Sequence, residues 1–582
     1  MKNFFFFILL VITSCGNAQN PNLNATQNSG SNASYNKSAK GPAINLKSYG
    51  AKGLGISSIK EDTTALRNAI AFLNKNGGGR LYVPDPPKFY AFAGDGIFVG
   101  DNIEIYGDGK GKSEIRNVAP TSGKFLRGPT FLFSTYGSSN DLNIFQQGIE
   151  QYAIQDAKKG DAVAVLADKS NTKNLYVGEV VVLGAGQIIK RATDVKNIGR
   201  FHFMELNEIS AIKGNNVYFT YPFSVQLPTF NGQSPVIVNI NNTKTVNPQL
   251  GIINKTSKNI YIHDLTLSQA QTDELHGTPL DENLKNGLSG VWQPGGAFNS
   301  TFKNIQINSF SGLGGNMFTR CRFSNMDVRA AKKLIDFGYG GSNDTVTDVK
   351  WEYMKSPASQ FASTFIICND GTHNILMYNI NCSGDWNGES LMLLSQTKEV
   401  TMHDIVLDFP NYQKNNTAIQ IGDKEGVYSR DINLYNIQIT VNTIGQFLRI
   451  GGENNVTDPN RNINISDITF KGNIATGNQN FSASDEITNQ KRAATKAMKA
   501  NNKSSKDQSV FIRNINGVNL KNVSIPSGEI YLENCNNSNF ETINAPSSTL
   551  MVAGSNSNCK FNDVKVLQKQ TEAQPVRNKN SF

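Results

Sequence analysis

The 582-residue sequence has few cysteines and few charged residues, and its apolar runs are too short to cross a bilayer. No spacing among the cysteines resembles a zinc site. Cys382 falls in an apolar column of the repeat described below, so it is expected to be buried as a small hydrophobe. Cys535 and Cys559 occupy different offsets in that repeat. The sequence therefore predicts neither a zinc site nor a disulfide.

Charged residues make up only 18% of the chain, whereas Gly is abundant at 51 residues and Asn is frequent throughout. Asn and Gly tolerate left-handed backbone, so this composition suits a β protein with many tight turns. The formal net charge of +9 favours an acidic partner. Nucleic acid is not expected as that partner, because the chain carries an export signal.

The export signal occupies residues 1–15, where Lys2 precedes the apolar run Phe4–Ile12. Ile12–Cys15 resembles a bacterial lipobox, which predicts that Cys15 becomes a lipidated N-terminus at the outer membrane. The alternative is an ordinary signal peptide cut near Ala18. Residues 16–43 are rich in Asn and Ser and predict a flexible tether.

A helix followed by a strand is predicted at the start of the mature chain. Asp62 or Thr63 can cap a helix whose apolar residues fall on one face, and Gly77–Gly79 end it before the strand Arg80–Val83. This arrangement resembles the N-terminal cap of the pectate-lyase-like β-helix superfamily, which includes pectin lyases, polygalacturonases and phage tailspikes. The resemblance implies the fold and a polysaccharide-degrading class, but it selects no reaction.

A repeat with a polar pivot runs through the rest of the chain, at intervals of about 21 to 32 residues. Apolar and polar residues alternate after each pivot, as a half-buried strand requires. A β-sandwich, the alternative, shows no such regular pivot. We therefore predict an all-β, right-handed parallel β-helix over residues 44–568, with an N-terminal capping helix. Its pivot side chains should stack in a line, among them Asn304, Asn325, Asp348, Asn379 and Asp404.

A second strand recurs about ten residues after each pivot, beginning with Met317–Cys321 and Leu334–Gly338. Two segments interrupt the pattern. Residues of about 120–250 predict a small β insertion, and those of about 482–508 a basic surface insert. A disordered tail is expected over 569–582.

The superfamily's substrate groove runs over the second strand, and polar residues gather on that part of the repeat between 312 and 400. Several have ordinary structural readings: Asp370 precedes Gly in a good turn, and Lys332 and Lys333 suit any exposed surface. The long loop 269–298, with Asp273, Glu274 and His276, is the replacement candidate. The predicted catalytic residues are Lys333, Asp336, Glu389, His373 and Arg320, the substrate-binding residues Lys332, Asn369, Asp385 and Trp386, and the metal ligand Asp370.

Three functions compete. Elimination at a uronate needs a base for the C5 proton and a cation for the carboxylate, which Lys332, Lys333, His373 and Arg320 supply; Ca²⁺ held by Asp336, Asp370 or Glu389 would assist. Hydrolysis needs two carboxyl groups, such as Asp336 and Glu389. A non-catalytic glycan-binding β-helix needs neither. The motifs of polygalacturonases and pectate lyases are absent, so the resemblance assigns no catalytic residue. Elimination on an acidic polysaccharide, with sulfated algal polysaccharides among the candidates, is favoured for a monomeric enzyme without other cofactors.

Overall fold

The computed structural model describes residues 40–571, and Cys15 with nearly all of the predicted tether lies outside this range. No helix among the described residues is long and apolar enough to span a membrane. Within the range, the following are not described: 95, 119–128, 134–149, 189–199, 231, 240–245, 248–251, 254–255, 271, 274–277, 280–290, 292–295, 339, 356–363, 370, 423–428, 452–460 and 476–507.

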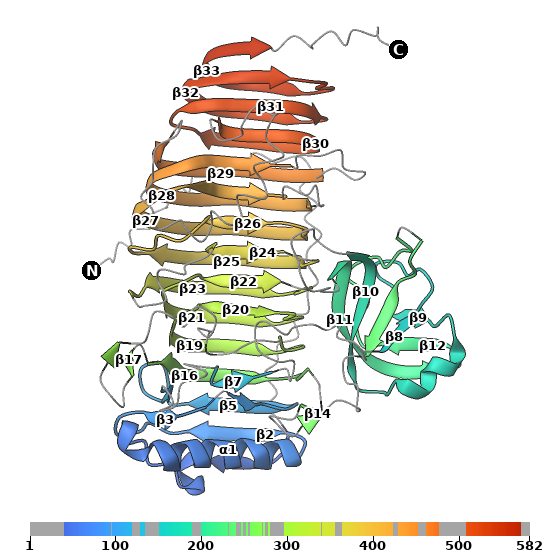
Figure 1. Ribbon diagram of the computed structural model, residues 1–582, viewed down its shortest axis with the longest axis vertical. Coiled ribbons are helices and arrows are strands. Elements are labelled where there is room, and N and C mark those ends of the chain that lie inside the picture. The colour runs from blue at the N-terminus through green and yellow to red at the C-terminus, as the bar shows by residue number, and fades with distance from the viewer. Residues whose placement is uncertain are drawn as a thin grey trace, which may run out of the picture. The chain divides into compact units, whose positions relative to one another are not determined.

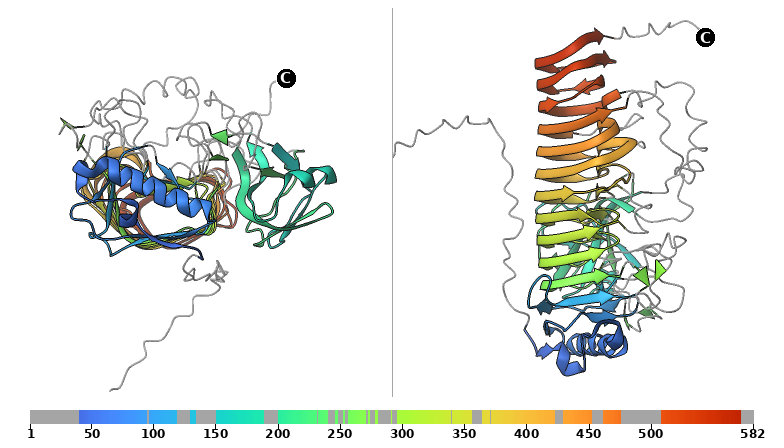
Figure 2. Two further views of the ribbon diagram at one scale, coloured as in Figure 1. Left: turned by 90° about the horizontal axis from the view of Figure 1, so that it is seen from below. Right: turned by 90° about the vertical axis from the view of Figure 1, so that its left-hand side faces the viewer.

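A helix closes the N-terminal end of the stack. Helix α1 (Ile59–Lys75) follows two short 3-10 helices, η1 (Leu46–Tyr49) and η2 (Gly55–Ser58), and buries Leu66, Ile70 and Leu73 completely. Its Asp62 is also buried, where its carboxylate accepts hydrogen bonds from the backbone N–H groups of Lys52 and Ala91. The helix lies across the end of the coils (Figure 2), which confirms the predicted capping helix, although it begins at Ile59 and not at Asp62 or Thr63.

Above the helix, parallel strands stack coil upon coil in one sheet of 21 strands (Figure 1). In each coil, inward side chains such as Ile305, Met326 and Val349 lie in register and are buried, so every coil contributes to one apolar core. This pairing confirms the predicted parallel β-helix. The early strands are β1 (Ala43–Asn45), β2 (Gly79–Val83), β3 (Tyr90–Phe92), β5 (Ile103–Gly107), β6 (Glu114–Asn117), β16 (Tyr261–Gln269), β19 (Thr301–Ser309), β20 (Leu313–Asn316), β21 (Arg322–Ala330), β22 (Ile335–Gly338) and β23 (Thr345–Tyr353).

The later coils continue the same pattern, and the long strand β27 pairs with both β25 and β26 of the preceding coil. They are β24 (Ile366–Cys368), β25 (His373–Ser383), β26 (Met392–Leu394), β27 (Lys398–Ile421), β28 (Arg430–Ile450), β29 (Arg461–Ile474), β30 (Gln508–Ser524), β31 (Gly528–Asn536), β32 (Asn539–Ala553) and β33 (Lys560–Thr571). Cys382 is fully buried in this core, as predicted, and the described cysteines are all unpaired.

The pivots form the predicted ladder. Asn304 donates from its side-chain amide to Asp264 of the preceding coil and accepts from Asn325 of the next, and Asn379 donates to Asp348 in the same way. These residues have left-handed backbone, with φ of 53° at Asn304 and 54° at Asn325. Asn and Asp adopt this conformation more readily than other residues with a Cβ, which is why they recur at the bend.

The second strand of the first regular coil differs from the prediction. It is β20, Leu313–Asn316, which pairs with β22, and not Met317–Cys321. Met317 and Arg320 instead have left-handed backbone, at φ of 61° and 57°, so the chain bends at both. The other second strands follow the sequence pattern. The predicted strand Leu334–Gly338 overlaps β22, and those at Phe365–Asn369, Leu391–Ser395, Ala418–Gly422, Phe447–Gly451 and Val510–Asn514 overlap β24, β26, the ends of β27 and β28, and the first part of β30.

The predicted insertion is a six-stranded antiparallel sheet beside the stack (Figure 1). Alternate residues of β10 face two ways: Val181 and Leu183 pack in the insertion's own core, whereas Val182 packs with Met204 against Phe298 and Met317 of the stack. The strands of this inserted sheet are β8 (Glu150–Ala153), β9 (Val163–Val165), β10 (Val180–Ile188), β11 (Arg200–Lys213), β12 (Asn216–Phe219) and β13 (Val236–Asn239), with 3-10 helix η3 at Lys169–Asn174. Short pairs complete the fold: β4 (Ile97–Phe98) with β7 (Phe131–Leu132), β14 (Val246–Asn247) with β15 (Ile252–Ile253), and β17 (Thr272–Asp273) with β18 (Thr278–Pro279).

Candidate functional site

The outward side of β22 carries a lysine–aspartate ion pair. Ile335 and Phe337 point into the core and are fully buried, so the alternation of the strand turns Asp336 outward. The Asp336 carboxylate is bound by the ammonium of Lys333 from the turn that enters the strand. Both side chains are only partly exposed, at 26% and 13%. The pair therefore sits in a partly desolvated position on the predicted groove strand.

Lys332 precedes this pair in the same turn. Burial, and to a smaller extent the neighbouring positive charge of Lys333, lower the pKa of Lys332 to about 8, while Asp336 acts in the opposite direction. A lysine with a pKa this close to neutrality has an appreciable fraction of free amine at physiological pH. Lys332 can therefore act as a proton acceptor, which an ordinary exposed lysine does poorly.

The turn that holds Lys332 is fastened to the loop after β25. Trp386 in this loop is fully buried, and its indole N–H donates to the Lys332 carbonyl at 2.6 Å. Its ring lies parallel to that of Tyr412 at 5.6 Å between centroids. The prediction that Trp386 stacks on a sugar is wrong, because its faces are covered by protein. Trp386 instead positions the backbone beside Lys332.

Two acids of the same loop keep their candidate roles. Asp385 is exposed and accepts a hydrogen bond from the side chain of Asn411 at 2.7 Å. Glu389 is also exposed, and its backbone carbonyl accepts from the hydroxyl of Tyr412. The loop is thus held at both ends by buried aromatic residues while its acids face solvent.

Asn369 follows β24, the strand next to β22, and its buried side-chain oxygen accepts no hydrogen bond from any residue that the structure describes. The predicted metal ligand, Asp370, lies outside the described residues. The described residues contain no group of three or more His, Cys, Asp or Glu side chains that can hold a metal ion. Asp336, one of the carboxylates predicted to hold Ca²⁺, is bound by Lys333.

Arg320 and His373 do not lie in an open groove, contrary to the prediction; the inserted sheet covers both. His373 is 1% exposed, and its ring contacts the Ser224 hydroxyl at 2.8 Å and the Gly371 carbonyl at 3.0 Å. The Arg320 guanidinium stacks over Tyr221, 4.1 Å from the ring centroid, and burial lowers its pKa. These two residues connect the insertion to the stack.

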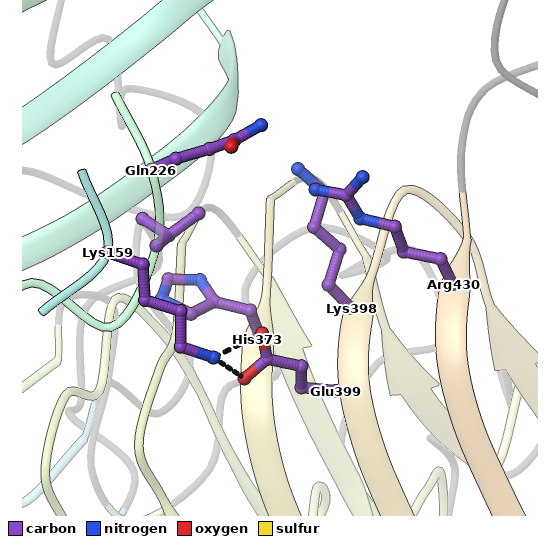
Figure 3. Close-up of a pocket in the computed structure, with 7 residues that line it drawn as sticks. Lys159, Gln226, His373, Lys398, Glu399 and Arg430 are labelled. Atoms are coloured by element: carbon purple, nitrogen blue, oxygen red, sulfur yellow. Dashed lines mark hydrogen bonds and ion pairs between the residues drawn. The ribbon is translucent and has the colours of Figure 1, made fainter. Parts of the chain in front are cut away.

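A cationic pocket lies where the inserted sheet meets the first residues of β25, β27 and β28 (Figure 3). It has a volume of about 70 Å³. The Lys159 ammonium of the insertion binds both carboxylate oxygens of Glu399 at 2.6 Å. Lys398 is 5% exposed, and its ammonium lies 3.2 Å from the centroid of the Phe203 ring. The lining residues are Lys159, Val225, Gln226, His373, Lys398, Glu399 and Arg430.

Sequence reasoning missed Lys159, Lys398, Glu399 and Arg430, although a signal for Glu399 exists. Five residues before each pivot the backbone bends a second time with positive φ. This second bend holds Asn or Asp in most coils, and Asn374 donates there to Asn343 as Asn299 does to Asn259. Arg320 and Glu399 break that series of Asn and Asp residues, and both reach the insertion. The other second bends of the regular coils are Asn259, Asn299, Asn343, Asn374, Asp431, Asn462, Gly517, Asn537 and Asn558.

No family model and no curated protein matches the chain. Among solved structures, it is similar to a tailspike protein of a Pseudomonas phage (12% identity, 90% of this chain and 81% of that chain, TM-score 0.39). It is also similar to the A-module of a mannuronan C-5 epimerase of Azotobacter vinelandii (12%, 91% and 100%, 0.33) and to a surface adhesin of Streptococcus pneumoniae (12%, 93% and 97%, 0.38). Likenesses this distant carry no argument about activity, and the parallel β-helix rests on the strand pairing above.

Proposed function

We propose that the protein is a polysaccharide-processing enzyme that cleaves an acidic glycan by β-elimination at a uronate. The observation that carries the proposal is the group on the turn into β22, where Lys332 has a pKa lowered to about 8 beside the Lys333–Asp336 ion pair. A base near neutrality and a fixed cation are the two groups that this reaction requires.

In this mechanism, the free amine of Lys332 removes the proton from C5 of the uronate. The electron pair moves into a C4–C5 double bond, and the bond between C4 and the glycosidic oxygen breaks. The leaving oxygen takes up a proton from water, so the products are a new non-reducing end with an unsaturated uronate and a free hydroxyl. Lys333, oriented by Asp336, neutralises the carboxylate on which negative charge develops when the proton leaves.

The ion pair favours elimination over hydrolysis. Hydrolysis would use Asp336 with Glu389 as two carboxyl groups. In the structure, Lys333 binds the Asp336 carboxylate, so one of these two carboxyl groups is already engaged by a cation. The net charge of +9 is consistent with an acidic glycan as the substrate.

The test is incubation with alginate, ulvan, pectin and glycosaminoglycans, with parallel assays for the ultraviolet absorbance of unsaturated uronates and for reducing ends. Elimination raises both signals. Reducing ends without absorbance would show hydrolysis, and retention of a glycan without either signal would show a binding protein. Lys332→Met should abolish the absorbance, whereas Lys303→Ala, an exposed lysine on another face of the stack, should leave it unchanged.

We further propose that a lipid on Cys15 anchors the enzyme to the outer membrane, on the basis of the lipobox-like Ile12–Cys15 segment. In cells, the wild-type protein should enter the detergent phase on extraction, and Cys15→Ala should enter the aqueous phase. Membrane partitioning by the Cys15→Ala variant would contradict lipidation at this residue.

A further inference from the structure

We propose that a single buried proton fastens the inserted sheet to the stack, so that docking of the insertion depends on pH. The groups that hold the proton are the carboxyl of Glu205 and the hydroxyl of Ser224 on the insertion, and the imidazole of His373 on the stack. This inference goes beyond the proposed function and does not rest on it, because it concerns how the two regions of the molecule are held together.

The three groups form a chain of contacts that is closed to solvent. Glu205, on β11, and His373, the first residue of β25, are each 1% exposed. The Ser224 hydroxyl lies between them, since it contacts Nε2 of His373 at 2.8 Å and is bonded to the Glu205 carboxyl. Nε2 itself lies 3.6 Å from that carboxyl. The Gly371 carbonyl lies 3.0 Å from Nδ1 of His373, and the Asn343 side-chain amide donates to the Ser224 hydroxyl at 3.0 Å. Insertion and stack therefore meet through one continuous hydrogen-bond network.

The number of protons in this network follows from its donors and acceptors. A carbonyl only accepts, so Nδ1 of His373 carries a proton, and Nε2 of a neutral ring is then an acceptor. An ionised Glu205 is an acceptor as well, and the one O–H of Ser224 can serve only one of the two. A neutral imidazole beside an ionised carboxylate therefore leaves a buried acceptor without a donor, which native structures generally avoid.

One added proton completes the network. Placed on His373, it makes Nε2 donate to Ser224, whose own O–H then donates to Glu205; placed on Glu205, it reverses the direction of both bonds. The Ser224 oxygen accepts two hydrogen bonds in either arrangement, one of them from Asn343. A second added proton would aim three donors at the two lone pairs of this oxygen. The docked network is therefore satisfied by one added proton, and not by none or by two.

Other charged side chains surround the network without joining it. Burial lowers the pKa of Arg320, and the nearby Glu205 carboxylate opposes this effect in part. Burial also raises the pKa of Asp344, which interacts with the charge of Arg320, well above its usual range. The pocket that His373 lines (Figure 3) holds the charged residues Lys159, Lys398, Glu399 and Arg430. Among the described residues, none of these side chains hydrogen-bonds to Glu205, Ser224 or His373. They therefore influence the pH at which the proton is gained or lost, but not the number of protons.

Docking then depends on pH on both sides of an optimum. In an open insertion the carboxyl and imidazole groups are in water, where such groups titrate at about pH 4.3 and 6.5. Between these values the open and docked forms hold the same single proton, so pH has no effect. Above about pH 6.5 the open form has lost its proton while the docked form still holds one, so rising pH favours opening by about tenfold per pH unit. Below about pH 4.3 the open form holds two protons, so falling pH also favours opening.

Peroxide oxidation of Met204 measures how often the insertion opens. Met204, which precedes Glu205 on β11, is 2% exposed and packs with Phe298 and Met317 of the stack. A thioether does not titrate, so its oxidation rate follows its exposure. In the wild-type full chain, the rate should be flat from about pH 5 to 6.5 and then rise about tenfold per pH unit. Met402, fully buried in the stack, is the internal reference, and mass spectrometry quantifies both sulfoxides.

Glu205→Gln tests the proton itself. The amide N–H of the variant can donate to Ser224, whose O–H then donates to His373, so the network is complete without an added proton. Oxidation of Met204 in this variant should stay slow and flat up to about pH 9. Glu208→Gln is the matched control, because Glu208 lies on the same strand and also reaches the stack, through Lys258 at 2.6 Å. This control should change the rate by a similar factor at every pH and keep the wild-type slope.

A flat wild-type profile from about pH 5 to 9 would overturn the proposal, and this measurement needs no variant. A wild-type slope in a folded Glu205→Gln would also overturn it, since the titrating proton would then lie elsewhere. Far-UV circular dichroism shows whether each variant is folded. Loss of the slope in Glu205→Gln, with the slope kept in Glu208→Gln, supports the proposal whether or not the protein cleaves a glycan.

Discussion

The stack and the inserted sheet pair their strands in different ways. In the stack, each strand lies in register with the same segment of the next coil, and Asn or Asp ladders repeat the bend. In the inserted sheet, neighbouring strands run antiparallel, as β10 and β11 do, and their register follows from no repeat. The stack is thus a periodic scaffold, whereas the insertion is a single irregular body fixed to it.

This difference separates two roles. The candidate chemistry of Lys332, Lys333 and Asp336 lies on the stack, in a turn that the repeat places in a defined position. The insertion contributes docking groups: apolar contacts at Phe298 and Met317, and polar contacts at the exceptional bends Arg320 and Glu399. Substitutions at the stack residues therefore test the candidate chemistry, and substitutions at the contacts of the insertion test how the insertion is held.

The largest expected effect is on turnover. Lys333→Ala, Asp336→Ala and Glu389→Ala should each lower turnover about 10²-fold or more if the residue takes part in acid–base or electrostatic catalysis. The midpoint of thermal unfolding should change little, because these side chains are outside the core. Lys213→Ala, an exposed lysine of the inserted sheet, is the control. Near-normal activity in all three variants would move the site to the 269–298 loop.

The sequence predicted the parallel β-helix well, because a periodic structure repeats the same residue pattern in every coil. The pivots from Asn304 to Asp404 could be read from spacing alone, since a stacked amide must recur at one bend. The burial of His373 and Arg320 could not be predicted in this way. It depends on where the insertion folds back, and the residues that cover them, Tyr221 and Ser224, lie about 100 or more positions away in the chain.

Trp386 shows a second limit. An aromatic residue beside two acids suggests a sugar platform, but the same pattern also fits a buried ring with one polar atom. In the structure, the indole N–H of Trp386 donates a hydrogen bond to the carbonyl of Lys332, which lies in another coil. The hydrogen-bond partner of the indole N–H distinguishes a sugar platform from a buried ring. That partner is distant in the chain, so the local sequence does not predict it.

The next largest effect is on the stability of the stack. Asn304→Ala should lower the free energy of unfolding by about 2 kcal/mol, since it removes two ladder bonds and places a Cβ residue other than Asn at positive φ. Asn304→Gly, which accepts that backbone, should lose less. Asn171→Ala in the insertion should change stability by under about 0.5 kcal/mol. Equal losses in the Ala and Gly variants would contradict a backbone contribution.

The pH dependence of turnover tests Lys332. Its free amine is the active form, and burial lowers its pKa to about 8, so turnover should rise with pH and level off above about 8. Below that value it should fall about tenfold per pH unit, because the amine becomes protonated. The wild-type profile measured from pH 6 to 10 checks this. A profile with no rising limb between pH 6 and 10 would contradict a lysine base.

The smallest effect is expected at the junction of the two regions. Glu399→Asn restores the usual residue of the second bend but removes the ion pair to Lys159, whose side chain is 54% exposed. Since exposed ion pairs contribute about 0–1 kcal/mol, the two changes should nearly cancel in unfolding experiments. Limited proteolysis should nevertheless cut the insertion faster in this variant. Unchanged proteolysis would show that the apolar contact alone holds the insertion.

The two ends of the stack differ in how their edge strands are covered. Helix α1 shields the first coil, whereas the outer edge of β33 pairs with no strand among the described residues, and Leu567 on this strand is 73% exposed. An open parallel edge is a template on which a second molecule can add its own strand. Lysines on β33, such as Lys565 with a side chain 68% exposed, would set like charges against each other in such an assembly. Self-association is therefore expected to depend on salt, and neutral residues in place of these lysines should allow two molecules to pair along this edge.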